Sequence, residues 1–126
     1  MILYLTVGTN DLTRTGAFYD VVLGEMGHSR LYEAENELCY GTRSEDMRLW
    51  VVRPFDDRPA TVGNGSMVAL SAESRAVVDQ CHAKGLAHGG TDEGAPGLRP
   101  YADNFYAAYL RDPDGNKLSI VCMAPG

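Results

Sequence analysis

The segment Tyr109-Leu110-Arg111-Asp112-Pro113-Asp114-Gly115-Asn116 carries the clearest local signal in this chain. From Asp112 to Gly115, proline takes the second position and glycine the fourth, which is the pattern of a type I turn. The flanking stretches, roughly Phe105 to Arg111 and Asn116 to Met123, are rich in strand-forming residues. The segment therefore predicts two strands joined by a tight turn near the end of the chain.

The rest of the second half completes a β-α-β-β-β pattern. In order, we expect a strand over Ser66 to Ala72, a helix over Glu73 to Lys84, a glycine-rich loop over Gly85 to Gly97 and a short strand near Leu98 to Ala102.

The first half shows the same order. Apolar and polar residues alternate from Ile2 to Thr9, as in a half-buried strand, and Asn10 or Asp11 can cap a helix that ends at Gly24. Three β-rich stretches follow, at Met26 to Glu33, Glu37 to Thr42 and Met47 to Arg53. We therefore expect one domain over residues 1–126, with a first module at about 2–54, a Pro- and Gly-containing linker at 55–65 and a second module at about 66–123.

Composition excludes several classes of function. The chain has 17 acidic and 11 basic residues and a net charge of −6, so nucleic acid is not an expected partner. It shows no secretory signal and no long apolar run, which predicts a cytoplasmic protein without a membrane partner. The three cysteines lack a metal-binding or redox spacing, so we expect buried thiols.

A family resemblance rests on several motifs in a fixed order. These are Leu5-Thr6-Val7-Gly8 with Asp11-Leu12, Ala17-Phe18-Tyr19 with Leu23-Gly24, and the segment from Tyr109 to Asn116. They resemble the vicinal oxygen chelate superfamily, which includes glyoxalase I, bleomycin-resistance proteins and extradiol dioxygenases. Residues 94–100, GAPGLRP, further resemble a branch of small glyoxalase-like proteins. The resemblance implies an α+β fold of two βαβββ modules, with curled mixed β-sheet cups, helices outside and a homodimer whose geometry stays open.

The resemblance also implies where a metal would bind. Metal-using relatives typically carry His, Glu or Gln, His and Glu at the positions that here hold Tyr4, Trp50, Met67 and Ser119. Indole only donates hydrogen bonds, a phenol stays protonated and a thioether prefers soft metals. We therefore expect no metal and no cofactor.

Strand alternation predicts what fills the cups. Alternate residues of a strand point to opposite faces of the sheet. In these strands one alternating set, which we call the apolar parity, should face the helices: Leu3, Leu5, Val7, Leu49, Val51, Val68, Leu70, Leu118, Ile120 and Cys122. The opposite parity gives the expected ligand-binding residues Tyr4, Thr6, Arg48, Trp50, Met67, Lys117 and Ser119. Aromatic rings, hydroxyls and two cations suit a small organic molecule with an anionic group. The alternative is that the same side chains plug a cup that binds nothing.

Other candidates carry weaker signals. Tyr4 is the one candidate for a catalytic acid, and only if a nearby cation activates it. His28, His82 and His88 are scattered, so surface or cap roles are expected rather than metal binding. The late aromatic residues Tyr101, Phe105, Tyr106 and Tyr109 fit either the cup or a subunit contact.

Three functions follow from these observations. The first is a metal-free dimer that binds a small aromatic or anionic compound, an antibiotic included, although Arg48 and Lys117 in the cup argue against the cationic drug bleomycin. The second is an enzyme: a glyoxalase-type lyase or isomerase, or a dioxygenase-like enzyme, with a relocated metal or with metal-free acid/base chemistry. The third is a structural or regulatory dimer whose cup is empty.

Overall fold

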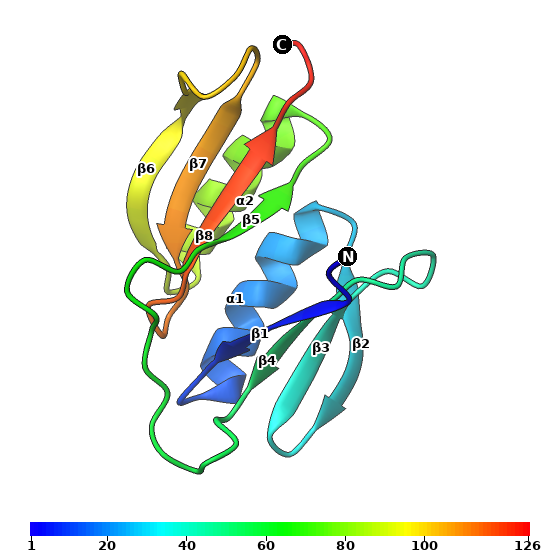
Figure 1. Cartoon of the computed structure of the whole chain (residues 1–126), viewed down its shortest axis with the longest axis vertical. Helices are drawn as coiled ribbons and strands as arrows, with labels where there is room; N and C mark the ends of the chain where they lie inside the picture. Colours follow the sequence, from blue (N-terminus) through cyan, green and yellow to red (C-terminus); the bar gives the residue numbers. More distant parts are fainter.

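The computed structural model describes residues 1–126 and contains two βαβββ units (Figure 1). The first unit consists of β1 (Tyr4–Gly8), α1 (Leu12–Glu25), β2 (Ser29–Ala34), β3 (Glu37–Gly41) and β4 (Arg48–Val52). The second consists of β5 (Val68–Ser71), α2 (Arg75–Ala87), β6 (Thr91–Leu98), β7 (Tyr106–Arg111) and β8 (Lys117–Cys122). The α+β class and the repeated βαβββ pattern expected from the sequence are therefore confirmed.

Each unit forms its own four-stranded mixed sheet. Sheet A has the order β1-β4-β3-β2, and sheet B has the order β5-β8-β7-β6. The pairs β1–β4 and β5–β8 are parallel, and all other pairs are antiparallel. No strand of sheet A contacts a strand of sheet B. The two units meet through their helices α1 and α2 (Figure 1), and Asn116, just before β8, also donates to the Gly8 carbonyl of β1 at 2.9 Å.

The core lies between the sheets and these two helices. Phe18 and Val22 of α1 and Val78 of α2 are fully buried against core residues of both sheets, such as Val51 and Ile120. Nearly all the strand residues of the apolar parity contribute to this core, as expected. Leu3 is the exception, with 64% of its surface exposed, because it lies before the first residue of β1 and beyond the cover of the helices.

The turn from Asp112 to Gly115 is formed as expected and ties the second unit to the first. Its backbone closes with a bond from the Gly115 N–H to the Asp112 carbonyl. The hydroxyl of Tyr19 on α1 donates to the buried carboxylate of Asp112 at 2.7 Å. Asp114 accepts hydrogen bonds from the Thr15 hydroxyl, the Asn10 backbone and Arg14, all at the start of α1.

The expected boundaries around the glycine-rich segment are wrong. Residues 91–98 form the strand β6, whereas a loop was expected up to Gly97. The strand expected over Leu98 to Ala102 is absent beyond Leu98, because residues 99–104 connect β6 to β7. Because β6 is an edge strand that pairs only with β7, it tolerates Pro96 and two irregularities in register.

The end of the first helix also differs from the expectation. Helix α1 runs past Gly24 to Glu25. Gly27 ends it instead, since its φ of 86° allows its N–H to reach the Gly24 carbonyl.

Two further features agree with the sequence. Cys39, Cys81 and Cys122 are buried and unpaired thiols, as expected. Neither helix of the structure is long and apolar enough to span a membrane.

Candidate functional site

The open face of sheet A carries a row of polar and aromatic side chains. Thr6, Trp50, Cys39 and Tyr32 are paired neighbours across β1, β4, β3 and β2. The rings of Tyr32 and Trp50 meet edge to face, with centroids 6.0 Å apart. Both side chains lie on the face turned away from α1, so an incoming molecule can reach them.

An open hollow of about 560 Å³ lies on this face. Its lining includes four residues expected from the sequence, namely Tyr4, Thr6, Arg48 and Trp50. The other residues of the lining are Leu3, Glu37, Asp46 and Val52. The volume lies within the range of about 300 to 1,000 Å³ that is usual for small-molecule sites.

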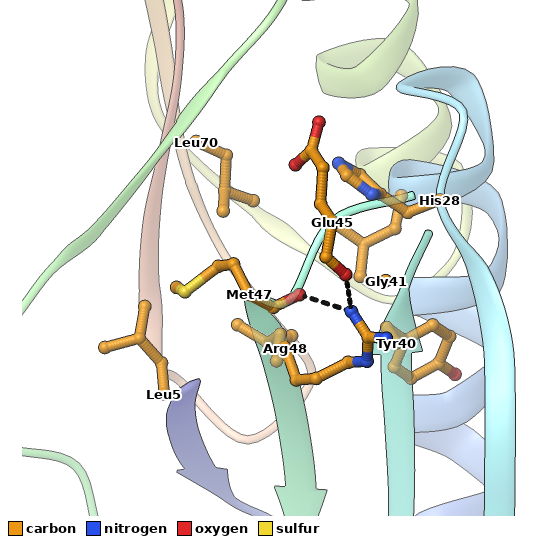
Figure 2. A pocket seen from close by; sticks show the side chains of 10 residues that line it. Leu5, His28, Tyr40, Gly41, Glu45, Met47, Arg48 and Leu70 are labelled. Carbon is orange, nitrogen blue, oxygen red and sulfur yellow. Dashed lines mark hydrogen bonds between the residues drawn. The ribbon is translucent and has the colours of Figure 1, made fainter. Parts of the chain in front are cut away.

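Arg48 is held at the end of this hollow by the chain that precedes β4. Its guanidinium donates to the carbonyl oxygens of Glu45 and Met47, the latter at 3.0 Å (Figure 2). It lies directly over Gly41, where a Cβ would come within 3.1 Å of Nη1. Arg48 has no carboxylate partner, and the backbone oxygens use only part of its five N–H donors.

A second, smaller cavity lies behind Arg48, between the two units (Figure 2). Leu5 of β1, Leu23 of α1 and Leu70 of β5 contribute to its apolar lining. Its volume of about 60 Å³ is too small for an organic ligand.

The open face of sheet B holds the remaining expected residues. Met67, which precedes β5, and Lys117 line a hollow of about 220 Å³ that also reaches Thr6 of β1. Ser119 lies directly opposite Tyr109 in the β7–β8 ladder, and its buried Oγ has no hydrogen-bond partner. The seven expected ligand-binding residues are thus divided between two sheets, with Thr6 common to both hollows.

The late aromatic residues separate by strand parity. Tyr109 lies on the open face of sheet B with Ser119, whereas Tyr106 lies on the helix side and donates to Asp79 of α2 at 2.6 Å. Tyr101 and Phe105 pack together at the β6–β7 turn, with ring centroids 5.3 Å apart.

Sequence reasoning missed two residues of these faces. Tyr32 was not assigned to a face, although the alternation around it could have placed it beside Trp50. Arg99 was not singled out, because the strand β6 that positions it was expected to be a loop. Its guanidinium carbon lies 5.4 Å from the centre of the Tyr109 ring, where Lys117 Nζ also lies at 5.8 Å.

Comparison with known proteins gives the family. A model of the Glyoxalase/Bleomycin resistance protein/Dioxygenase superfamily matches residues 1–120. The chain belongs to this superfamily. Among proteins of curated function, none matches.

Solved structures agree with this assignment. The chain is similar to a glyoxalase/bleomycin resistance protein from Albidiferax ferrireducens T118, with 37% identity, 99% of both chains covered and a TM-score of 0.89. Its fold is also that of a glyoxalase-related enzyme from Fulvimarina pelagi, at 19% identity, a TM-score of 0.77 and 97% and 87% of the two chains covered. A lactoylglutathione lyase from Agrobacterium tumefaciens shares the fold at 20% identity, a TM-score of 0.69 and 97% and 92% coverage.

The side chains at the positions where the resemblance places the metal ligands do not fit a divalent ion. Tyr4 and Trp50 lie on sheet A, Ser119 lies on sheet B, and Met67 directly precedes β5. These positions supply a phenol, an indole, a thioether and a hydroxyl, none of which is an anionic or imidazole donor. The structure contains no group of three or more His, Cys, Asp or Glu side chains suited to a metal ion.

The histidines are scattered over the fold, as expected, and do not form a cluster with Tyr4. His88 caps the C-terminus of α2, whereas His82 is buried instead of lying at the surface and links α2 to β6 through the Asp92 carboxylate at 2.8 Å. His28 lines the small cavity behind Arg48, and its buried Nδ1 has no hydrogen-bond partner. Tyr4 is 56% exposed, and the guanidinium of its neighbour Arg48 is turned toward carbonyl oxygens.

Cys39 offers no activated nucleophile on the face of sheet A. Burial raises the pKa of its thiol, and Glu37 adds to this effect while Arg48 opposes it. A thiol with a raised pKa stays protonated near neutral pH. The open faces are therefore suited to stacking and hydrogen bonding.

Proposed function

We propose that this protein is a metal-free binding protein of the superfamily, which holds a small aromatic or anionic compound, an antibiotic included, between its two open sheet faces. The single observation that supports the proposal most strongly is the environment of Trp50 on the open face of sheet A. The only tryptophan of the chain lies in a hollow of about 560 Å³ beside Tyr32, without any metal-ligating side chain at the superfamily positions. Ring stacking on such a pair contributes about 0.5–1.5 kcal/mol beyond simple burial.

Within one chain, the hollow that reaches both sheets is only about 220 Å³ and does not include Trp50, so the Trp50 face and the Lys117 face do not close on one ligand there. A two-fold dimer solves this, since sheet A of one copy can face sheet B of the other, and the same contact then occurs twice. The exposed apolar residues beside the hollow of sheet A support such an interface: Ile2, Leu3, Tyr4 and Met47.

In such a dimer, the two copies contribute different side chains to the same binding site. Sheet A contributes the rings of Trp50 and Tyr32, and sheet B contributes Met67 and Lys117. Affinity would then depend on apolar contact and charge, and no residue needs to move a proton. We place the protein in the cytoplasm, where its buried cysteines remain reduced.

A thermal-shift screen over aromatic acids and antibiotics tests this function. A compound present at a hundred times its dissociation constant should stabilise the fold by about 2.7 kcal/mol. Quenching of Trp50 fluorescence by the same compound would locate it on the face of sheet A. If no compound of either class shifts the midpoint or changes the fluorescence, the binding function is wrong.

A further inference from the structure

Two cations surround one aromatic ring on the open face of sheet B. Arg99 Cζ lies 5.4 Å and Lys117 Nζ 5.8 Å from the centre of the Tyr109 ring. Neither cation takes part in an ion pair, whereas Arg111 on the same side of β7 is neutralised by Glu93. Both cations therefore remain available to an anion from outside the chain.

The backbone of the β6–β7 hairpin holds Arg99 in this place. The Arg99 N–H donates to the Phe105 carbonyl at 2.8 Å, and the guanidinium Nη2 donates to the Ala95 carbonyl at 2.7 Å. The side chain folds back over β6, where a Cβ on Gly94 would lie 3.3 Å from Nη2 and a Cβ on Gly97 would lie 3.0 Å from Nη1. The two glycines therefore leave room for the guanidinium to reach the ring of Tyr109.

A third polar group on this face also lacks a partner. Ser119 is the direct neighbour of Tyr109 across the β7–β8 ladder, and it is 1% exposed with an unsatisfied Oγ. Leaving a buried hydroxyl without a hydrogen bond costs free energy. An anion beside Tyr109 would give Arg99 and Lys117 a charged partner that they lack within the chain, and a small rotation of Ser119 would give its hydroxyl an acceptor.

We propose that Arg99 and Lys117, arranged around Tyr109, form the anion subsite of the ligand-binding cup, so that the ligand is an aromatic carboxylic acid rather than a neutral or cationic aromatic compound. This inference rests on the proposed function. Sheet A is the less suitable face for the anionic group, because Glu37 and Asp46 line its hollow together with Arg48. We therefore place the ring of the ligand against Trp50 and its carboxylate beside Arg99 and Lys117.

Phenylacetate and phenylacetamide test the subsite, because they share a ring and differ by one charge. Both are titrated into the wild-type protein, Arg99→Gln and the control Arg58→Gln, with calorimetry and Trp50 fluorescence as readouts. Arg58 is an exposed linker cation without an ion pair. We expect the wild type and Arg58→Gln to bind phenylacetate about tenfold or more tightly than phenylacetamide. Arg99→Gln should bind both compounds as weakly as the amide.

Each other outcome overturns the subsite in a distinguishable way. Equal binding of both compounds by the wild type contradicts the anion subsite and leaves the binding function intact. An equal loss of both compounds in Arg99→Gln indicates a structural role for Arg99 and also contradicts the subsite. If the wild type binds neither compound, the subsite is wrong, and the thermal-shift screen over aromatic acids and antibiotics decides the proposed function separately.

Discussion

Trp50 of β4 and Tyr32 of β2 meet edge to face on the open side of sheet A, with ring centroids 6.0 Å apart and an interplanar angle of 62°. Cys39 of β3 lies between them in the strand register and is 4% exposed. The pair therefore covers the middle of the sheet and at the same time presents aromatic surface to the hollow. Core packing alone does not require this arrangement, since both rings lie on the face opposite α1.

Replacement of Trp50 should separate binding from folding. In Trp50→Ala, we expect the loss of the roughly 2.7 kcal/mol stabilisation that a saturating aromatic acid gives the wild type. The ligand-free protein should stay folded, because Trp50 is only partly buried and lies outside the core cluster. Thermal unfolding with and without ligand measures both effects.

Tyr101→Ala is the matched control for this experiment. Tyr101 is 72% exposed at the β6–β7 turn, away from the hollow of sheet A. Its variant should keep the ligand-induced shift. A full shift in Trp50→Ala would mean that the ligand binds elsewhere.

The link between Asp114 and α1 should contribute to stability. The carboxylate of Asp114 is 2% exposed and accepts from Thr15, Asn10 and Arg14. Asp114→Asn removes the charge and one acceptor, so we expect the free energy of unfolding to fall by about 1–3 kcal/mol. Urea denaturation measures the loss, and Asp103→Asn, at an exposed turn position, should show almost none.

The same carboxylate predicts an acid-sensitive stability. Burial raises the pKa of Asp114, but its hydrogen bonds and Arg14 outweigh this effect, and the pKa lies below its ordinary value. The stabilisation is therefore complete above the unfolded pKa of about 3.9, and it is lost as the pH falls through the lower folded value.

Asp114→Asn should lose this part of the pH dependence. Urea midpoints measured from neutral pH down to the acid limit of folding compare the variant with the wild type. Asp112 has the opposite effect on the pH dependence of stability. Its pKa is raised, because burial raises it more than the hydrogen bonds of the carboxylate lower it. An identical acid slope in both proteins would show that Asp114 is not the group responsible.

The dimer can be tested at its expected apolar contact. Leu3 is 64% exposed beside β1 and lines the hollow of sheet A. Leu3→Asp places a charge in the interface, and sedimentation equilibrium should show a shift from dimer to monomer with a loss of ligand binding. Leu86→Asp, on the exposed side of α2, should remain dimeric. A wild-type protein that stays monomeric at high concentration would contradict the two-copy cup.

Local sequence patterns were sufficient for most of the fold. The turn from Asp112 to Gly115 and the two similar halves predicted the order of most elements, and the alternation in β1, β4, β5 and β8 predicted the faces of the residues in those four strands. Edge strand β6 could not be recognised, because its Gly and Pro residues are typical of loops and only pairing with β7 makes them a strand.

The sheet faces of the candidate site residues were predictable, but the way in which the two sheets bring these residues together was not. Parity placed Trp50 and Lys117 on the faces opposite the helices, and the structure agrees. The division of these residues between two sheets depends on how α1 and α2 pack, and no local pattern encodes that contact. Arg99 was missed for the same reason as β6, since its position beside Tyr109 follows from the hairpin.

The central claim is that the cup binds an organic ligand without a metal. Its most direct test is a phenylacetate titration, followed through Trp50 fluorescence, on protein dialysed against EDTA and checked by elemental analysis. We predict saturable binding with the same affinity before and after dialysis and no stoichiometric metal in either sample. About one tightly held divalent metal per chain, or binding that is lost with EDTA and restored by adding the metal, would contradict the account.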